Sequence, residues 1–395
     1  MSHVKLGDLF RVGSSKRVLQ SQWTTEGIPF YRGREITKLS ESGFVENDLF
    51  ITEELFKDLS QRSGVPQAGD LMITAIGTIG NSYIVCPDDR FYFKDASVLW
   101  LARNSDVSSE YINHWLKSPL FLDQLDRGNG ATVDTLTIQK LQGVLVHVPS
   151  ASEQRRIVTL LDEAFADIAT AKANAEKNLQ NARKLFESHL QAIFSTRGAN
   201  WEDKTLEQIS TTFGRGKSRH RPRNDPSLYG GKYPFIQTGD VRNAEHIITE
   251  FSQTYSEAGL AQSKLWPKGT ICITIAANIA ETGILGFDAC FPDSVIGVVP
   301  NPNEAEVGYV EYVLQSFKAR LQALGQGSAQ ANINMGTFEN ERFPFPKVEE
   351  QRRIVTKLDA LSEESQRLES IYRQKLTALD DLKKSLLHQA FSGLL

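Results

Sequence analysis

Two stretches of the chain place apolar or small residues at alternating spacings of four and three, which is the heptad pattern of a coiled-coil helix. The first seam consists of Ile157, Leu161, Ala164, Ile168, Ala171, Ala175, Asn178, Ala182, Leu185, His189 and Ala192; the second consists of Ile354, Leu358, Leu361, Ser365, Leu368, Tyr372, Lys375, Leu379, Leu382, Leu386 and Gln389. The first seam is rich in Ala and the second in Leu, so the two helices can approach closely. We therefore expect them to pack on each other as an antiparallel coiled coil.

Local signals set the expected bounds of the first long helix. The sequence Ser150-Ala151-Ser152-Glu153 follows Pro149 and has the spacing of a capping box, and no Gly or Pro occurs from residue 152 to 196. Gly198 is a typical C-terminal stop. At a rise of 1.5 Å per residue, about 43 helical residues would reach about 65 Å.

The rest of the chain has the patterning of mixed α and β structure. Short β-branched runs bounded by Gly, Pro or Asn predict strands at Asp70–Ile76, Tyr83–Cys86, Val98–Ala102, Val144–Val148, Thr270–Ala276 and Val295–Val299. Helical periodicity predicts helices at Tyr111–Leu125 and Glu306–Leu324. Each divergent region is thus expected to form one compact α/β domain.

The chain repeats itself. Residues 153–162 read EQRRIVTLLD and residues 350–359 read EQRRIVTKLD, so nine of ten positions are identical at an offset of 197. Weaker matches extend the repeat in both directions, with the offset rising to 205 near the start of each half. We expect an internal duplication with a pseudo-two-fold axis, made of a domain at 1–150, a helix at 151–198, a second domain at 199–347 and a helix at 348–395.

Composition limits the class of protein. The 395 residues are 40% hydrophobic and 23% charged, which is typical of a globular protein, and the net charge of −4 requires any polyanion site to be local. Cys86, Cys272 and Cys290 are far apart and argue against disulfides and structural zinc. Neither a signal peptide nor an apolar run long enough to span a bilayer occurs. We expect a cytoplasmic protein without a membrane segment.

Motifs of catalysis are missing from the sequence. It contains no phosphate-binding loop of the Walker type, no GxGxxG, no HExxH, no GxSxG and no Asn/Asp-Pro-Pro-Tyr of amino-methyltransferases, and its seven His residues form no cluster. A nuclease site built from Pro87-Asp88 or Pro292-Asp293 with Glu202-Asp203-Lys204 is an alternative on scattered fragments. We therefore predict no catalytic and no metal-binding residue in this chain.

Local basic and polar segments are the positive signals for nucleic acid. Between Gly214 and Asn224 the sequence has five cations and no acidic residue, and the counterpart in the first half is weaker. Where the first half has Tyr31-Arg32-Gly33-Arg34, the second has Ile236-Gln237-Thr238-Gly239, so the two halves could contact different bases, Arg to guanine and Gln to adenine. The predicted DNA-binding residues are Lys16, Arg17, Arg32, Arg34, Thr78, Arg215, Lys217, Arg219, Arg221, Arg223, Gln237 and Arg242. A solvated surface loop is the alternative for the basic run, and a simple hairpin turn is the alternative for Thr78-Ile79-Gly80-Asn81.

These features together resemble the specificity subunit of type I restriction-modification systems. The resemblance rests on two divergent domains alternating with two similar long helices, the duplicated EQRRIV after a Pro, Gly69-Asp70-Leu71-Met72-Ile73-Thr74 with Gly77-Thr78-Ile79-Gly80, and the segment from Gly327 to Ile333. In the first half, residues 130–134 depart from that last segment.

The resemblance implies a chain that recognises double-stranded DNA and has no catalytic role. Two target-recognition domains would bind the halves of a split, asymmetric site, while the helices would dock two modification subunits near Arg155-Arg156 and Arg352-Arg353, and restriction subunits would join them. S-adenosylmethionine, ATP and Mg would then be bound by the partner subunits, and this chain would bind no cofactor. The alternatives are a scaffold that binds only proteins and an autonomous nuclease or methylase.

The duplicated helices predict a ruler for the gap between half-sites. Inserting one heptad after Ala173 and one after Ser370 should lengthen both helices by about 10 Å and preserve the seam. Because duplex DNA rises about 3.4 Å per base pair, the preferred gap should grow by roughly three base pairs while the recognised bases stay the same. Selection of bound duplexes from a library of varied gaps checks this; a folded variant that still selects the original gap would contradict it.

Overall fold

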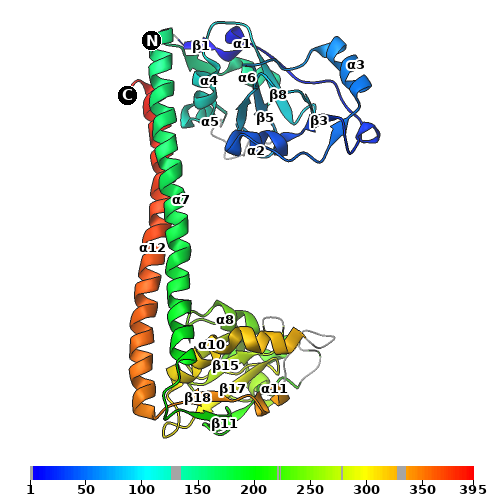
Figure 1. Cartoon of the computed structure of the whole chain (residues 1–395). Coiled ribbons are helices and arrows are strands. Elements are labelled where there is room, and N and C mark those ends of the chain that lie inside the picture. The colour runs from blue at the N-terminus through cyan, green and yellow to red at the C-terminus, as the bar shows by residue number, and fades with distance from the viewer. Residues whose placement is uncertain (1–2, 126–134, 220–221, 223, 277–278, 327–334) are drawn as a thin grey trace. The chain divides into compact units, whose positions relative to one another are not determined.

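The computed structural model describes residues 3–125, 135–219, 222, 224–276, 279–326 and 335–395 (Figure 1). By its internal contacts the chain divides into two compact units: unit 1 comprises Met1–Glu176 with Gln374–Leu395, and unit 2 comprises Lys177–Arg373. The two longest helices, α7 (Ala151–Ser195) and α12 (Val348–Ser392), each contribute a segment to both units. Each unit therefore contains one divergent domain packed on two helix segments.

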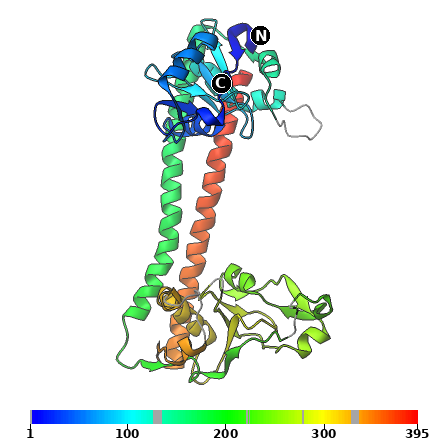
Figure 2. The same ribbon diagram turned by 90° about the vertical axis from the view of Figure 1, so that its right-hand side faces the viewer.

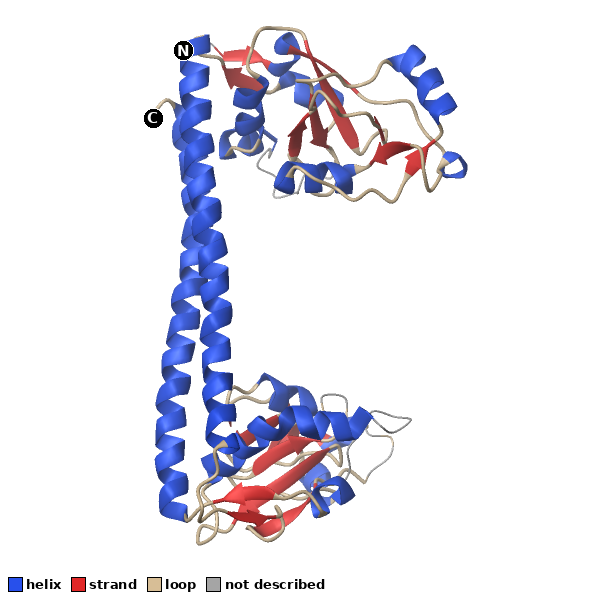
Figure 3. Ribbon diagram, viewed as in Figure 1, coloured by secondary structure: helices blue, strands red, loops and turns tan. Residues whose placement is uncertain are grey.

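The domain of unit 1 is built on an antiparallel sheet with the strand order β2-β8-β5-β6 (Figure 3). Its strands are β1 (His3–Lys5), β2 (Phe10–Gly13), β3 (Ile28–Tyr31), β4 (Phe50–Ile51), β5 (Leu71–Thr74), β6 (Ser82–Ile84), β7 (Tyr92–Phe93), β8 (Val98–Arg103) and β9 (Leu145–His147). Its helices are α1 (Leu6–Leu9), α2 (Gly33–Ser42), α3 (Glu53–Ser63), α4 (Ser109–Leu116), α5 (Pro119–Leu125) and α6 (Ile138–Gly143), with a 3-10 turn at Gln20–Gln22. A second sheet has the order β4-β3-β7, and β1 pairs with β9.

Alternation along the strands of unit 1 gives the sheet two buried faces. Ile73 and Leu99 belong to the core that includes α4 and the end of α12. Met72 and Trp100 belong to a separate core with Ile36 of α2.

The domain of unit 2 repeats this plan with a sheet of order β11-β17-β15-β16-β13 (Figure 3). Its strands are β10 (Glu202–Lys204), β11 (Ser210–Arg215), β12 (Tyr229–Phe235), β13 (Ile247–Ile248), β14 (Gln253–Tyr255), β15 (Ile271–Thr274), β16 (Thr282–Leu285), β17 (Val295–Pro300) and β18 (Phe343–Phe345). Its helices are α8 (Thr238–Asn243), α9 (Glu257–Ala261), α10 (Val307–Gln326) and α11 (Met335–Glu339), with a 3-10 turn at Pro226–Leu228. Strand β12 pairs with β14, and β10 pairs with β18.

Equivalent hydrogen bonds confirm the duplication inside the domains. In unit 1 the Thr74 hydroxyl accepts a hydrogen bond from the Asn81 amide at 3.1 Å, and the Gly80 amide donates to the Thr74 carbonyl. In unit 2 the Thr274 hydroxyl accepts from the Glu281 amide at 3.0 Å, and the Ala280 amide donates to the Thr274 carbonyl. The two turns therefore have the same construction at an offset of 200.

All six strands predicted from the sequence are present, but one predicted helix is wrong. The segment Tyr111–Leu125 forms two helices, α4 and α5, rather than one. Pro119 has no amide hydrogen and begins the second helix, while the Ser118 hydroxyl donates to the Trp115 carbonyl at 2.6 Å. The helix predicted at Glu306–Leu324 is confirmed as α10.

Helices α7 and α12 are antiparallel neighbours within each unit (Figure 2). In unit 1, Lys172 is paired with Asp380 at 2.6 Å, and Arg156 donates to the carbonyl of Leu395 at 2.9 Å. In unit 2, Arg183 is paired with Glu369 at 3.0 Å, and the Ser365 hydroxyl donates to the carbonyl of Ala182 at 2.7 Å. Residue numbers rise along one helix as they fall along the other, which confirms the predicted antiparallel pairing.

The predicted heptad seam does not continue to the ends of the helices. From Ile157 to Ala182 of α7, five of the predicted positions are buried, but Leu185 is 47% exposed, and its place is taken by Phe186, Leu190 and Phe194. On α12, Leu382 is 46% exposed, whereas Leu387 and Phe391 are buried. The reason is that these ends pack on the domain cores, whose surfaces follow the 3.6-residue period of a straight helix rather than the 3.5-residue seam.

The capping box predicted at the start of α7 is half formed. The Glu153 amide donates to the Ser150 hydroxyl at 3.3 Å, as expected. The Glu153 carboxylate, however, pairs with Arg156 at 2.7 Å instead of the backbone.

A buried glutamine of each EQRRIV repeat joins the domain to its helix. Gln154 accepts a hydrogen bond from the Ser108 amide at 2.9 Å and donates to the Pro149 carbonyl at 2.9 Å. Gln351 accepts from the Glu306 amide at 2.9 Å and donates to the carbonyls of Glu304 and Pro346. Both side chains satisfy backbone groups at the place where a domain meets its helix.

Removing the side-chain amide of this glutamine should therefore destabilise the chain. We expect Gln351→Ala to lower the free energy of unfolding by about 1–3 kcal/mol, because buried backbone groups lose their partners. Gln366→Ala is the matched control on the same helix: its side chain is exposed and donates to Glu245, so the expected change is within about 0.5 kcal/mol. Urea unfolding followed by circular dichroism measures both, and equal midpoints for the two variants would contradict the assigned role of Gln351.

Candidate nucleic-acid interface

In unit 1, four loops meet at the end of the sheet where β2 and β5 finish. The Ser15 hydroxyl donates to the Phe93 carbonyl at 2.6 Å, the Lys94 amide donates to the Tyr31 carbonyl at 2.8 Å, and the Ala75 amide donates to the Ser97 carbonyl at 2.9 Å. These contacts tie together residues 14–17, 31–34, 75–81 and 94–97. The structure thereby brings together the predicted residues of the first half, which are Lys16, Arg17, Arg32, Arg34 and Thr78.

Arg32 and Arg34 flank the N-terminus of α2 and share two carboxylates. Arg32 donates to both oxygens of Glu35, at 3.1 and 3.0 Å, and to Asp48 at 3.1 Å. Arg34 donates to Glu35 at 2.8 Å and to both oxygens of Asp48 at 2.8 and 2.9 Å. The cluster is thus locally neutral, with two cations and two anions.

The hydrogen bonds of this cluster shift the pKa values of Glu35, Asp48 and Arg34. Burial alone would raise the pKa of Glu35, whose side chain is fully buried, but hydrogen bonds from the Arg32 side chain and backbone and from Arg34 lower it overall. The hydrogen bond from Arg34 lowers the pKa of the exposed Asp48, and the bonds to Asp48 and Glu35 raise the pKa of Arg34. Glu35, Asp48 and Arg34 are therefore charged at neutral pH.

The other predicted residues of the first half are exposed. Lys16 and Arg17 are on the surface, and within the described part of the chain neither side chain forms an ion pair. Thr78 lies in the connection between β5 and β6. These two strands are an antiparallel pair, so the segment is the turn of a β-hairpin. The Thr78 hydroxyl is 3.1 Å from that of Thr37 on α2, which places the turn beside the Arg cluster's helix.

In unit 2 the corresponding loops meet in the same way. The Lys217 amide donates to the Phe291 carbonyl at 3.1 Å, the Ile275 amide donates to the Ser294 carbonyl at 3.0 Å, and Arg215 donates to the Asp293 carbonyl at 2.7 Å. Gly216 is required here, since a Cβ would lie 2.2 Å from the Phe291 carbonyl oxygen.

The basic segment of unit 2 is only partly described. The side chains of Lys217 and Arg219 are exposed, and the Arg219 amide donates to Gln262 at 2.6 Å. Arg221 and Arg223 lie outside the described residues.

Gln237 takes in unit 2 the place that Arg32 has in unit 1. Each is the N-cap residue of its helix, and each amide donates to the acidic residue three positions later: Arg32 to Glu35 at 2.8 Å, and Gln237 to Asp240 at 2.7 Å. The Gln237 side chain donates to Gln253 at 2.7 Å. Arg242 is exposed in the last turn of α8, away from the N-cap, and already has an interaction within the chain.

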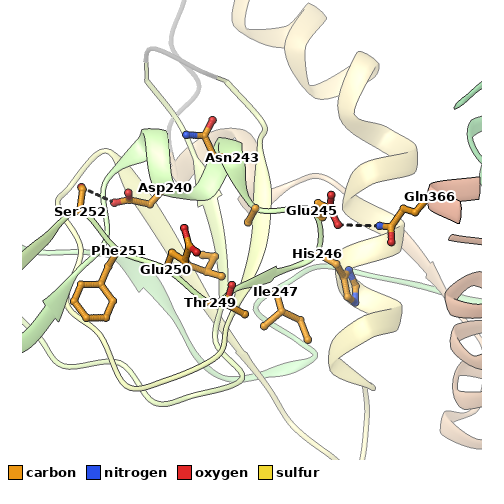
Figure 4. Close-up of a pocket in the computed structure, with 12 residues that line it drawn as sticks. Asp240, Asn243, Glu245, His246, Ile247, Thr249, Glu250, Phe251, Ser252 and Gln366 are labelled. Atoms are coloured by element: carbon orange, nitrogen blue, oxygen red, sulfur yellow. Dashed lines mark hydrogen bonds between the residues drawn. The ribbon is translucent and has the colours of Figure 1, made fainter. Parts of the chain in front are cut away.

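A pocket of about 670 Å³ lies beside these residues on unit 2, along the edge strand β13 (Figure 4). Asp240, Glu245 and Glu250 line it, and Ser252 and Gln366 donate hydrogen bonds to Asp240 and Glu245. Three carboxylates repel phosphate, so we do not place DNA in this pocket.

The arginines of the two EQRRIV repeats are exposed on the long helices. Arg156 is paired with Glu153. Arg155, Arg352 and Arg353 form no ion pair with any described residue. The side chains of Arg155, Arg352 and Arg353 are therefore available to interact with another molecule.

Neither a cluster of metal-ligating side chains nor a membrane-spanning helix is found among the described residues. Nowhere in that part of the chain do three or more His, Cys, Asp or Glu side chains gather in a way that would hold a metal ion. No described helix has the length and apolar character needed to cross a membrane.

Reasoning from the sequence missed Glu35, Asp48 and Gln253. The spacing Arg32-x-x-Glu35, repeated as Gln237-x-x-Asp240, could have revealed the first, because an acidic residue three positions after an N-cap is a capping signal. Asp48 and Gln253 are distant in sequence from the side chains that they hold. Their contacts depend on the pairing of β3 with β4 and of β12 with β14.

Comparison with known proteins gives consistent results. The chain is 31% identical over 162 residues to a putative type I restriction enzyme specificity subunit, S.HindORF215P, of Haemophilus influenzae, which covers 40% of this chain and 39% of that protein. It is 21% identical over 308 residues to the StySPI specificity subunit of Salmonella potsdam, which covers 73% of this chain and 65% of that protein. The chain therefore spans less than two thirds of the length of each of these relatives.

A solved structure supports the fold. A chain from work on complex assembly and conformational transition of the type I R-M system has a TM-score of 0.80 at 18% identity, with 100% of this chain and 98% of that one covered. The family model described as type I restriction modification DNA specificity domain matches twice, over residues 1–179 and 199–377. Because these two matches cover most of the sequence, the chain belongs to the type I restriction modification DNA specificity family.

Proposed function

We propose that this chain is the DNA-recognition subunit of a type I restriction-modification complex and that each domain reads one half of a bipartite, asymmetric site. One observation carries the proposal: the two units place different polar side chains, Arg32 and Arg34 in one and Gln237 in the other, on the same helix N-terminus of the same scaffold. A shared backbone geometry with exchanged hydrogen-bonding groups is what two related readers of different bases require.

Phosphate contacts come from other residues of the same surfaces. Lys16, Arg17, Lys217 and Arg219 are exposed beside the N-caps, where flexible cations can follow the DNA backbone. In this arrangement the Arg–carboxylate cluster and the Gln pair supply base contacts, and the basic loops supply affinity.

Partner subunits carry the chemistry in this proposal. Two modification subunits dock on the long helices near Arg155-Arg156 and Arg352-Arg353, and restriction subunits join that core. The partners bind S-adenosylmethionine, ATP and Mg, and the methyl transfer takes place on a base turned out of the duplex. This chain contributes recognition without a catalytic group or a cofactor of its own.

A scaffold that binds only proteins is the main rival. Mobility shift with random duplex, followed by selection of bound sequences, separates the two functions. The proposal expects retention of DNA and recovery of two fixed sequence blocks separated by a fixed gap, whereas a protein scaffold retains no duplex.

The division of labour gives one prediction. The purified chain should neither methylate nor cut DNA, and with modification subunits it should form a complex containing two of them per copy. Native mass spectrometry measures the stoichiometry, and transfer of labelled methyl groups to DNA measures activity. A complex with a single modification subunit, or methylation by the chain alone, would count against the proposal.

A second prediction concerns the basic segment between Gly214 and Asn224. Replacing Arg219, Arg221 and Arg223 with Ala should weaken binding to every duplex and reduce the slope of log K against log salt by about 0.9 for each phosphate that the variant no longer binds. Replacing the exposed Lys357 and Arg367 of α12 with Ala is the control for loss of general positive charge. If the loop variant has the wild-type slope, the segment is a solvated surface loop.

A further inference from the structure

The two units hold their N-cap side chains by a residue from the same place in the fold. In unit 1 that residue is Asp48, two positions before β4, and in unit 2 it is Gln253, the first residue of β14. Strand β4 is the antiparallel partner of β3, which leads into α2, and β14 is the antiparallel partner of β12, which leads into α8. The pairings Pro29 with Phe50 and Pro234 with Thr254 put the two segments in nearly the same register.

In unit 1 this arrangement fixes which edge of each guanidinium is available. Both arginines use Nε and Nη2 for the carboxylates of Glu35 and Asp48. Among the described residues, neither Nη1 group has a partner. The carboxylates therefore leave the two N–H donors of Nη1 on each arginine in a fixed place, where they can donate to a base-edge acceptor such as O6 or N7 of guanine.

In unit 2 the same arrangement fixes a pair of amides. Nε2 of Gln237 donates to Oε1 of Gln253 at 2.7 Å. This bond leaves Oε1 of Gln237 as an acceptor and Nε2 of Gln253 as a donor. An acceptor beside a donor matches the N6 and N7 edge of adenine.

Stability does not explain the pair of Arg34 with Asp48. The side chains of Arg34 and Asp48 are 53% and 63% exposed, and exposed ion pairs contribute little to folding. A carboxylate at a DNA surface also weakens binding to phosphate. Its presence beside two predicted base-contacting arginines is better explained by a requirement for their orientation.

We propose that Asp48 and Gln253 are positioning residues that orient the base-contacting side chains of their own domains and so determine the base preference of each half-site. This inference rests on the proposed function and deepens it. Asp48 holds Arg32 and Arg34 as oriented donors and prevents them from acting as mobile phosphate contacts. Gln253 fixes the side chain of Gln237, so that Oε1 of Gln237 is the acceptor and Nε2 of Gln253 is the donor offered to a base.

The test uses the chain assembled with its modification subunits and a library of random duplexes from which bound sequences are selected. The wild type first defines the two half-sites. Asp48→Asn should reduce the preference at one or two base pairs of one half-site by about fivefold or more and leave the other half-site unchanged. It should also increase the salt slope by about 0.9, because the released arginines reach one more phosphate.

Two further variants sharpen the result. Gln253→Glu should change base preference only in the half-site that Asp48→Asn leaves alone, since it converts the donor amide into a carboxylate. Asp58→Asn is the matched control, because Asp58 forms a similarly exposed ion pair with Arg62 at 3.1 Å on α3. The control should change neither base preference nor salt slope.

The outcomes separate the inference from the function on which it rests. If the wild type selects a bipartite sequence but Asp48→Asn changes only the overall affinity, Asp48 is a surface ion pair and the inference is wrong. If Asp48→Asn fails to fold, as judged by circular dichroism, Gln253→Glu decides the question in the second domain, where an unchanged sequence profile overturns it. A wild-type complex that selects no sequence at all overturns the proposed function itself.

Discussion

One buried glutamine satisfies the backbone groups at the place where each domain meets its long helix. Where a domain meets the start of its helix, backbone amides and carbonyls are left without partners in secondary structure, and burying them unpaired is costly. Gln154 and Gln351 each accept from one amide and donate to at least one carbonyl across this junction. At the end of the nearly identical stretch, Asp162 and Asp359 contact the domains too, through His114 in unit 1 and Tyr312 in unit 2. The near-identity of the EQRRIV segments thus has a local physical cause.

A fixed junction allows the surfaces at the far end of each sheet to diverge. The turn after β5 and the turn after β15 have the same hydrogen bonds around Thr74 and Thr274, and the N-caps of α2 and α8 have the same backbone bond to an acidic residue. The side chains exposed on this framework differ. Backbone groups must be satisfied in any variant, whereas exposed side chains at a helix N-terminus are limited mainly by what they contact. Divergence after duplication can therefore change the exposed surface of a domain at little cost to folding.

Much of this could be predicted from the sequence, because it depends on local pattern. The six strands, helix α10 and the antiparallel helices follow from hydrophobic periodicity and from the repeat. Of the predictions that were wrong, the one for the ends of the heptad seam failed because tertiary contacts decide it. Leu185 fits a heptad seam, yet Phe186 is the residue that packs against the domain core. The break at Pro119 was readable from the sequence, but the apolar periodicity across it favoured a single helix. For the candidate site, Arg32, Arg34 and Gln237 were predicted from the sequence and stay predictions. Asp48 and Gln253 could not be found from the sequence, because their contacts require strand pairing.

In the proposed function a chain with a net charge of −4 binds a polyanion selectively, and the distribution of charge is consistent with that role. In unit 1 the arginines at the N-cap are neutralised by Glu35 and Asp48, so they add little to attraction for any duplex. In unit 2 the equivalent pair of amides carries no charge. Under the proposed function, attraction for DNA then comes from the exposed cations of neighbouring loops, such as Lys16 and Lys217, because contacts to phosphate do not depend on sequence. Groups that carry no net charge are not attracted to phosphate. At a mismatched base such groups lose their hydrogen bonds, and no attraction to phosphate replaces them. The proposed function therefore assigns specificity and affinity to different side chains on one surface, so that each can change without the other.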